Sequence, residues 1–215
     1  MSIFDRFHYI VIEGPIGSGK STLARKLGDM FPVNLLLENA DANPFLPKFY
    51  QDAPRYALST QMFFLFQRVE QIRSLNQRDM FSQHTIADFF LEKDPLFAQM
   101  NLNDEEYALY RQMYKHLHVQ VPTPDLVIYL QTPVDTLHER VNQRHTSYEQ
   151  EIPKEYLGRL ADAYSNFFHQ YDGAPVLIVN NEKLDITEQE SAMNMLLERV
   201  MQIRSRREFF NPNME

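Results

Sequence analysis

The stretch Gly14-Pro15-Ile16-Gly17-Ser18-Gly19-Lys20-Ser21 decides the fold, because it has the G-x-x-x-x-G-K-[ST] spacing of a phosphate-binding P-loop. Backbone amides must approach a phosphate tail closely, and glycine permits the unusual dihedral angles that this approach requires. Lys20 would reach the β- and γ-phosphates, while the Ser21 hydroxyl would bind Mg²⁺. We therefore expect a nucleotide to be held by Gly14, Pro15, Ile16, Gly17, Ser18, Gly19, Lys20, Ser21 and Thr22.

The segments on either side of this loop have the pattern that a P-loop requires. Residues 8–13 are a short apolar run typical of a strand, and residues 21–27 have helical character. The order of strand, loop and helix favours a nucleotide site over an ordinary glycine-rich turn. The positive end of a helix that begins near Ser21 would also attract phosphates.

Composition and charge narrow the class of protein. The chain has 215 residues, of which 44% are hydrophobic and 23% are charged, as is usual for a soluble globular domain. With 21 basic and 29 acidic residues, its formal net charge is −8, which argues against nucleic acid or an anionic membrane as a partner. A polyphosphate must then be held by a local cluster of cations and a metal ion.

Cysteine usage and the apolar runs bear on the compartment. The sequence contains no cysteine, which excludes disulfides and thiolate metal sites. Residues 1–7 lack the apolar core of a signal peptide, and no run approaches the ~18 apolar residues of a membrane span. We therefore expect a cytoplasmic protein.

Strand-like apolar runs alternate with helical segments along the chain. Buried strands that alternate with helices form a parallel sheet, so we expect an α/β fold with a five-stranded parallel sheet flanked by helices. No linker or repeat divides residues 1–215, which predicts a single domain. Three prolines in residues 39–54 predict an irregular segment there. We expect strands at 8–13, 33–37, 85–87, 126–130 and 176–179, and helices at 21–30, 56–77, 103–117, 133–144, 155–171 and 187–207.

Two of the expected elements have apolar side chains on more than one side. The strand at 33–37 reads as buried on both faces. In the helix at 56–77, apolar residues cover more than one stripe, which predicts burial on two sides. A second subunit could cover the outer side of this helix.

Acidic side chains follow two of the expected strands. Glu38 comes directly after the second strand and Asp88 directly after the third. Ligands gather at the carboxyl ends of parallel strands, and a carboxylate next to a buried run is costly without a partner. Each could be a structural cap, but the pair beside a P-loop favours function: Glu38 could accept a proton from an attacking hydroxyl, and Asp88 could hold Mg²⁺.

Two further pairs of polar residues have helical spacing. Arg140 and Arg144 lie four apart, so they form either a solvated basic face or a clamp on a transferring phosphoryl group. Gln61 and Arg68 lie seven apart, two turns along one face. That pair is either a satisfied core hydrogen-bond pair or a reader of a base edge.

Several motifs along residues 8–200 together resemble the deoxynucleoside kinase family, close to its bacterial deoxyadenosine/deoxyguanosine kinase branch. The resemblance begins with residues 12–21 around the P-loop and continues through Asn43-Pro44-Phe45-Leu46-Pro47-Lys48-Phe49-Tyr50 and Gln61-Met62-Phe63-Phe64-Leu65. Further matches are Ile86-Ala87-Asp88-Phe89, Lys93-Asp94-Pro95-Leu96-Phe97, residues 124–130 and residues 137–144.

The resemblance implies transfer of the γ-phosphate of ATP to the 5′-hydroxyl of a deoxynucleoside, with Mg²⁺, by a homodimer. Position by position, it makes Glu38 the general base and Asp88 the acidic member of the family's Asp/Glu-Arg-Ser motif. It assigns catalytic roles to Lys20 and to the lid arginines, within a lid at about 140–152. The substrate-binding residues that it implies are Tyr50 and Glu149 for the sugar, and Gln61, Arg68 and Asp94 for the base.

The sequence departs from the family pattern at two places. Phe89 stands where the motif has an arginine, and Lys93 is the cation further on that could replace it. In the lid, the usual Arg-Gly-Arg reads Arg144-His145-Thr146, which leaves one cation fewer. Both changes alter the set of cations that would neutralise the charge of the transferring phosphoryl group.

Two alternatives to a deoxynucleoside kinase share these motifs. A thymidylate-kinase-like monophosphate kinase has the same P-loop and lid arginines, but its acceptor phosphate would need cations where Phe89 and Glu38 stand. A non-catalytic nucleotide-binding scaffold would be expected to lose Lys20, Glu38 or Asp88, and all three are present.

Overall fold

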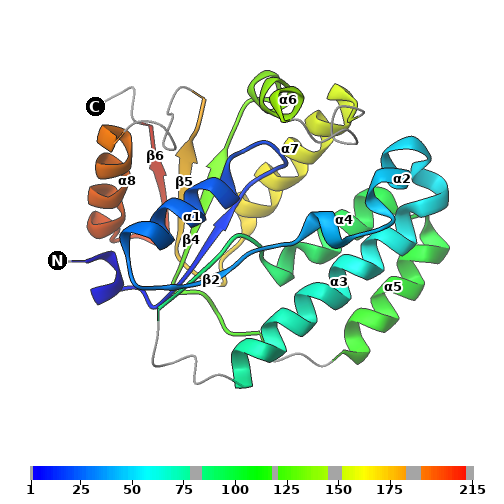
Figure 1. Cartoon of the computed structure of the whole chain (residues 1–215), viewed down its shortest axis with the longest axis horizontal. Coiled ribbons are helices and arrows are strands. Elements are labelled where there is room, and N and C mark those ends of the chain that lie inside the picture. Colours follow the sequence, from blue (N-terminus) through cyan, green and yellow to red (C-terminus); the bar gives the residue numbers. More distant parts are fainter. Residues whose placement is uncertain (1, 78–83, 118–120, 145–151, 183–189, 212–215) are drawn as a thin grey trace.

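Six parallel strands form one sheet in the order β2-β3-β1-β4-β5-β6 (Figure 1). The structure is a computed structural model that describes residues 2–77, 84–117, 121–144, 152–182 and 190–211. Every hydrogen-bonded pair of neighbouring strands is parallel. The strands are β1 (Tyr9–Glu13), β2 (Asn34–Leu36), β3 (Thr85–Ala87), β4 (Leu126–Gln131), β5 (Val176–Asn180) and β6 (Arg207–Phe210).

Helices lie on both faces of this sheet, and a group of them extends beyond one side of it (Figure 1). A short 3₁₀ turn, η4 (Leu91–Lys93), leads directly into α4. The helices are α1 (Lys20–Met30), α2 (Leu46–Gln51), α3 (Ala53–Gln77), α4 (Asp94–Asn101), α5 (Asp104–His116), α6 (Val134–Gln143), α7 (Lys154–Gln170) and α8 (Glu190–Gln202).

Successive side chains of the central strands enter two different apolar layers. In β1, Val11 packs into one layer, whereas Ile10 and Ile12 pack into the other. In β4, Val127 and Tyr129 alternate in the same way with their neighbours. Since side chains alternate along a strand, a continuous apolar run fits a sheet that is covered on both faces.

Each layer is closed by its own helices. Leu23 and Leu27 of α1 and Leu196 of α8 belong to the layer that Ile10 and Ile12 enter. Residues of α3 and α7, among them Leu65 and Leu160, belong to the opposite layer. The expected α/β fold is confirmed, with helices flanking a parallel sheet.

The number of strands differs from the expected five. The last helix ends at Gln202 rather than near the expected residue 207, and Arg207–Phe210, where no strand was expected, form the sixth strand. Arg207–Phe210 pairs in register with Val176–Val179 of β5, so β6 extends the sheet at its edge. Its inner residue Phe210 is buried while Phe209 is 57% exposed. One buried contact on an edge strand is a weak sequence signal.

Two local predictions are wrong. The strand at 33–37 is not buried on both faces, because β2 lies at the edge of the sheet and Leu35 is 39% exposed. The segment 39–54 is not irregular throughout: it contains α2 and the first residues of α3. Pro47 and Pro54 lie within the first turns of these helices, where a proline is tolerated because its missing N–H has no helical partner.

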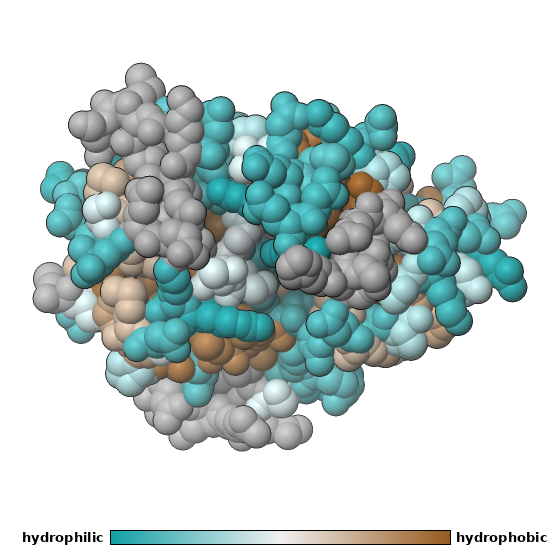
Figure 2. Space-filling view, turned by 45° about the horizontal axis from the view of Figure 1, so that its top comes forward, coloured by the Kyte–Doolittle hydropathy of each residue, from teal (hydrophilic) through white to brown (hydrophobic). Residues whose placement is uncertain are grey.

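Helix α4 (Asp94–Asn101) was not expected, whereas most of the other helices and strands begin and end close to the expected residues. Asn103 caps α5, where its side chain accepts from Glu106 N and the Glu106 side chain accepts from Asn103 N. None of the described helices is both long and apolar enough to span a lipid bilayer. On the face in Figure 2, hydrophilic residues cover most of the surface, with smaller hydrophobic groups between them.

Candidate functional site

The P-loop has the backbone geometry that a phosphate site needs. Gly17 and Gly19 have φ of +88° and +87°, in the left-handed region that favours glycine. A Cβ on Gly17 would also lie 2.9 Å from the carbonyl oxygen of Leu137 in α6. The absence of a side chain at Gly17 therefore lets the loop lie close to that helix. Helix α1 starts at Lys20, so its unpaired backbone N–H groups face the loop.

The side chain of Asn181 holds the P-loop through a hydrogen bond to the backbone of Ser18. Asn181 Nδ2 donates to the carbonyl oxygen of Ser18 at 2.7 Å and to Thr132 Oγ1 at 3.3 Å. The Ser18 hydroxyl is buried and has no hydrogen-bond partner among the described residues. An orphaned donor in a phosphate-binding loop fits a polyphosphate, whose oxygens accept hydrogen bonds.

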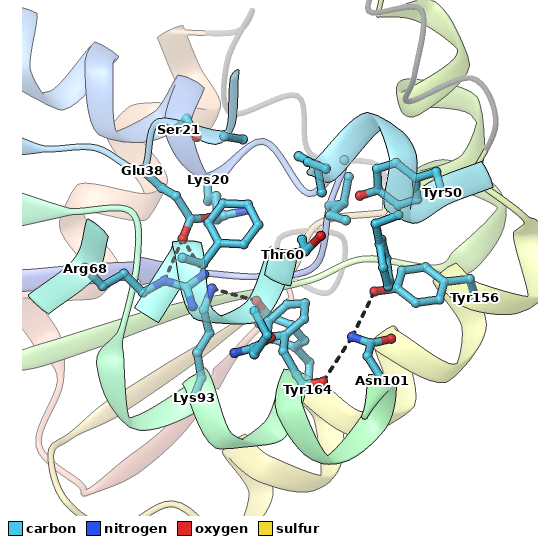
Figure 3. A pocket seen from close by; sticks show the side chains of 18 of the residues that line it. Lys20, Ser21, Glu38, Tyr50, Thr60, Arg68, Lys93, Asn101, Tyr156 and Tyr164 are labelled. Carbon is cyan, nitrogen blue, oxygen red and sulfur yellow. Dashed lines mark hydrogen bonds and ion pairs between the residues drawn. The ribbon is translucent and has the colours of Figure 1, made fainter. Parts of the chain in front are cut away.

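A cavity of about 150 Å³ opens beside the P-loop, at the carboxyl ends of β1 and β2 (Figure 3). Charged and polar side chains line the part next to the loop, with Lys20, Ser21 and Glu38 among them. Aromatic and small side chains line most of the rest. The expected site residues that reach this cavity are Ile16, Gly17, Gly19, Lys20, Ser21, Glu38, Tyr50, Gln61, Arg68 and Arg144.

Arg68 joins two carboxylates that lie far apart in the sequence. Its guanidinium forms an ion pair with Glu38, with Nε donating to Glu38 Oε1 at 2.7 Å, and a second ion pair with Asp94. Tyr110 OH and Gln61 Nε2 also donate to Asp94 Oδ1, the latter at 2.9 Å. Asp94 is fully buried and does not line the cavity, so it acts on the cavity through Arg68 and Gln61.

The charges around Glu38 determine its ionisation. Burial alone would raise the pKa of Glu38, but Arg68, Lys93 and Lys20 outweigh this effect and hold the pKa below its usual value. Burial and the charge of Lys93 lower the pKa of Lys20, against the opposing effect of nearby carboxylates. These charges therefore favour the ionised form of the Glu38 carboxylate in the folded protein.

A second buried ion pair lies beneath the P-loop. Lys93 Nζ lies 2.7 Å from Glu13 Oε1 and donates to Glu13 Oε2 and to Tyr164 OH, each at 2.9 Å. Tyr164 OH donates to Glu13 Oε2 at 3.2 Å, and Gly14 N donates to the same oxygen at 3.1 Å. Lys93 lines the cavity although it is only 2% exposed. This cluster ties the first residue of the P-loop to a cation at the cavity wall.

Asp88, directly after β3, lies next to Glu38, which follows the neighbouring strand β2. Asp88 Oδ1 accepts from Glu38 N at 2.7 Å, so the two predicted carboxylates are neighbours at the sheet edge. The other oxygen, Oδ2, is buried without a hydrogen-bond partner among the described residues. A fully buried carboxylate with one orphaned oxygen fits a metal ion or its bound water. Ser21, the second predicted Mg²⁺ ligand, lines the cavity, whereas Asp88 is not among its lining residues.

The lid residues are brought to the cavity only in part. Arg144, directly after α6, lines the cavity, whereas Arg140 is not among the lining residues. Glu149, expected to contact the sugar, lies outside the described residues, as does the lid segment 145–151. Phe89 is buried in the core, so it leaves the position of the motif arginine without a cation, and Lys93 is the nearby cation at the cavity.

Sequence reasoning missed several residues of this site. Glu13 is the last residue of the first expected strand and pairs with Lys93, and the sequence signal for this pair is a carboxylate directly before the P-loop. Thr60, Asn101, Tyr156 and Tyr164 also line the cavity. Nothing in the local sequence distinguishes these four from other polar residues of amphipathic helices, because only the packing of α3, α4 and α7 brings them together.

Comparison with known proteins gives consistent matches over nearly the whole chain. The sequence profile described as deoxynucleoside kinase matches residues 10–204. A deoxyguanosine kinase of Bacillus subtilis is 30% identical over 200 residues, covering 91% of this chain and 97% of the relative. A deoxyadenosine kinase of Lactobacillus acidophilus is 29% identical over 205 residues, covering 89% and 94%.

Among solved structures, a deoxyadenosine kinase from M. mycoides with the products dCMP and a flexible dCDP bound has the same fold. It superposes with a TM-score of 0.78 at 26% sequence identity, over 91% of this chain and 100% of the other.

Proposed function

Because this chain belongs to the deoxynucleoside kinase family, we propose that it transfers the γ-phosphate of ATP to the 5′-hydroxyl of deoxyadenosine or deoxyguanosine. The kinase activity itself follows from family membership, since matched relatives of nearly full length are deoxynucleoside kinases. The choice of purine deoxynucleosides rests on the names of these relatives. The observation that carries the mechanism is the position of the ionised Glu38 beside Lys20 at one end of a single cavity.

The P-loop backbone, Lys20 and the Ser18 hydroxyl would hold the phosphates of ATP. Bound Mg²⁺ would neutralise phosphate charge, and Ser21 and Asp88 would hold the ion, directly or through water. The orphaned oxygen of Asp88 and the exposure of Ser21 to the cavity support these two roles. Both are groups that a divalent cation prefers, a carboxylate and a hydroxyl oxygen.

Glu38 would accept the proton of the 5′-hydroxyl as the hydroxyl oxygen attacks phosphorus. Arg68 keeps Glu38 ionised and fixes its orientation through an ion pair and a hydrogen bond. The carboxylate disfavours an acceptor that carries a phosphate at this place, which speaks against a monophosphate kinase. Gln61, Arg68 and Asp94 would recognise the base, and Tyr50 and Glu149 the sugar.

Lys93 would supply the charge that the missing motif arginine supplies in the family. Its Nζ is fixed by Glu13 and Tyr164 and lies at the cavity wall, near enough to affect the pKa of both Glu38 and Lys20. Arg144, and Arg140 if the lid closes, would stabilise the transferring phosphoryl group. We expect residues 1–215 to form one such domain, with a lid at 140–152.

The quaternary structure and the compartment are further parts of this proposal. A homodimer is supported by Phe66 of α3 and Leu109 of α5, which are 43% and 46% exposed although both are large and apolar. A cytoplasmic location suits a donor, ATP, that the cell keeps in its interior.

A phosphorylation assay tests the proposed function. The protein is incubated with Mg²⁺ and ATP and, in separate reactions, with deoxyadenosine, deoxyguanosine, deoxycytidine, thymidine and the four monophosphates. We expect turnover of the purine deoxynucleosides and none of the monophosphates. Turnover of a monophosphate alone would establish a monophosphate kinase instead, and ATP binding without turnover of any acceptor would indicate a scaffold.

A further inference from the structure

The side chains predicted to read the base are already engaged with one another. Both amide hydrogens of Gln61 point to Asp94, where Nε2 donates to Oδ1 at 2.9 Å and to the backbone oxygen at 3.2 Å. Asp94 accepts from Arg68 and Tyr110 as well, and Arg68 also holds Glu38. These donors therefore already have protein partners, and a polar group outside the network is one that can add a hydrogen bond to a ligand without breaking an existing one.

Thr60 is such a group. It precedes Gln61 on α3, is 6% exposed and lines the cavity, and its hydroxyl has no hydrogen-bond partner among the described residues. A threonine within a helix commonly turns its hydroxyl to the carbonyl oxygen three or four residues earlier, which satisfies it. Thr60 does not make this bond. A buried hydroxyl without a protein partner carries a free-energy cost unless something in the cavity satisfies it.

The surroundings of Thr60 suit a neutral aromatic ring. Ala57 and Phe64, one turn to either side on α3, line the same cavity, as does Phe97 of α4. In Figure 3 the Thr60 side chain lies between the charged end, with Lys20 and Glu38, and the end formed by Tyr50 and Tyr156. Apolar walls with few neutral polar groups are typical of a site for a flat, uncharged ligand.

We propose that the Thr60 hydroxyl forms a hydrogen bond with the base of the bound deoxynucleoside and thereby helps to determine which bases are accepted. This inference rests on the proposed function, because it places the 5′-hydroxyl at Glu38 and hence the base in the uncharged part of the cavity. A hydroxyl rotates and can either donate or accept, so it can serve an amino group of adenine or a carbonyl group of guanine at the same place. Thr60 thus provides a contact that both purines can satisfy.

The variant Thr60→Val tests this role, because valine has the shape and the rotamer preference of threonine without the hydroxyl. Two controls accompany it. Thr60→Ser retains the hydroxyl, and Thr85→Val makes the same change at a second buried hydroxyl without a hydrogen-bond partner, at the start of β3. Thr85 is not among the residues that line the cavity.

Binding of deoxyadenosine, deoxyguanosine, deoxycytidine and thymidine is measured by isothermal titration calorimetry without ATP, which makes the result independent of phosphoryl transfer. For Thr60→Val we expect affinity for deoxyadenosine and deoxyguanosine to fall roughly five- to tenfold, and affinity for deoxycytidine and thymidine to fall less. Thr60→Ser and Thr85→Val should stay within about twofold of the wild type. The thermal midpoint of Thr60→Val should not fall, because an unsatisfied hydroxyl is removed.

Unchanged affinities in Thr60→Val would overturn the inference. An equal loss with all four nucleosides would also overturn it, since that result would place the contact on the sugar that they share. Wild-type protein that binds a nucleoside but never phosphorylates it would refute the proposed function while the comparison of bases still decides the role of Thr60. If the wild type binds none of the four, both fail.

Discussion

Glu38 and Arg68 lie thirty positions apart in the chain, and the properties of the proposed base depend on that contact. Arg68 is buried between two carboxylates, and burial alone would lower the pKa of its guanidinium, but Glu38 and Asp94 raise it. The guanidinium therefore stays charged and keeps Glu38 ionised. The protonation state of the proposed base is thus set by its neighbours.

Replacing Glu38 by glutamine should remove the proton acceptor and keep the shape of the side chain. We expect Glu38→Gln to fold and to bind nucleoside, with kcat lower by about 10²- to 10⁴-fold. Glu70→Gln is the matched control, since Glu70 lies on the surface of α3 with its side chain 74% exposed. Steady-state kinetics measure both. A Glu38→Gln variant with the rate of the wild type would refute the assignment of the base.

The pH dependence of kcat/KM should reflect the lowered pKa of Glu38. A carboxylate whose pKa lies below the usual 4.5 stays ionised as the pH falls towards that value, and its contributions to activity and stability are lost only below it. We therefore expect no decrease from Glu38 between about pH 8 and pH 5. In Arg68→Gln the burial of Glu38 is less opposed, so the acid limb should move to higher pH. An acid limb that does not move would contradict the pairing of Arg68 with Glu38.

At the scale of elements, the ion pair of Glu13 and Lys93 holds together β1 and η4, the turn that leads into α4. The two side chains are 0% and 2% exposed, and they are eighty positions apart in the chain. Burial raises the pKa of Glu13 although Lys93 opposes this, so the carboxylate depends on its partner. Removing one member would leave an uncompensated buried group directly below the P-loop.

The variant Lys93→Met should therefore lose about 3–5 kcal/mol of unfolding free energy, the usual cost of breaking a buried pair. Arg73→Met breaks an exposed pair with Glu70 on α3 and should cost less than about 1 kcal/mol. Urea denaturation followed by circular dichroism compares the two. If Lys93→Met is too unstable to purify, adding Glu13→Gln should restore part of the stability. Equal small losses in both single variants would show that the buried pair does not hold the elements together.

At the scale of the whole molecule, the outer helices leave large apolar side chains in contact with solvent. Phe66 of α3 and Leu109 of α5 are both exposed, and these two helices pack against each other on the same side of the sheet (Figure 1). Exposed apolar side chains of this size are typical of protein interfaces. The proposed homodimer would cover them.

The variant Phe66→Glu should therefore dissociate the dimer, because it would bury an unpaired charge in the interface. Light scattering after size-exclusion chromatography should give about twice the chain mass of 25.5 kDa for the wild type and one chain mass for the variant. Met195→Glu, which changes an exposed apolar residue of α8, should remain a dimer. A wild type that elutes as a monomer at micromolar concentration would refute the dimer.

The sequence by itself determined the parallel α/β fold and the places of the P-loop, Glu38 and Asp88. Those features are local: a contiguous loop binds phosphate with its own backbone, and a carboxylate that follows a buried strand must lie at the sheet edge. Only the tertiary structure decided the sixth strand, the pairing of Lys93 with Glu13 and the orphaned hydroxyl of Thr60. These depend on which elements pack together, and contacts over separations of eighty to 151 residues leave no periodic pattern in the chain.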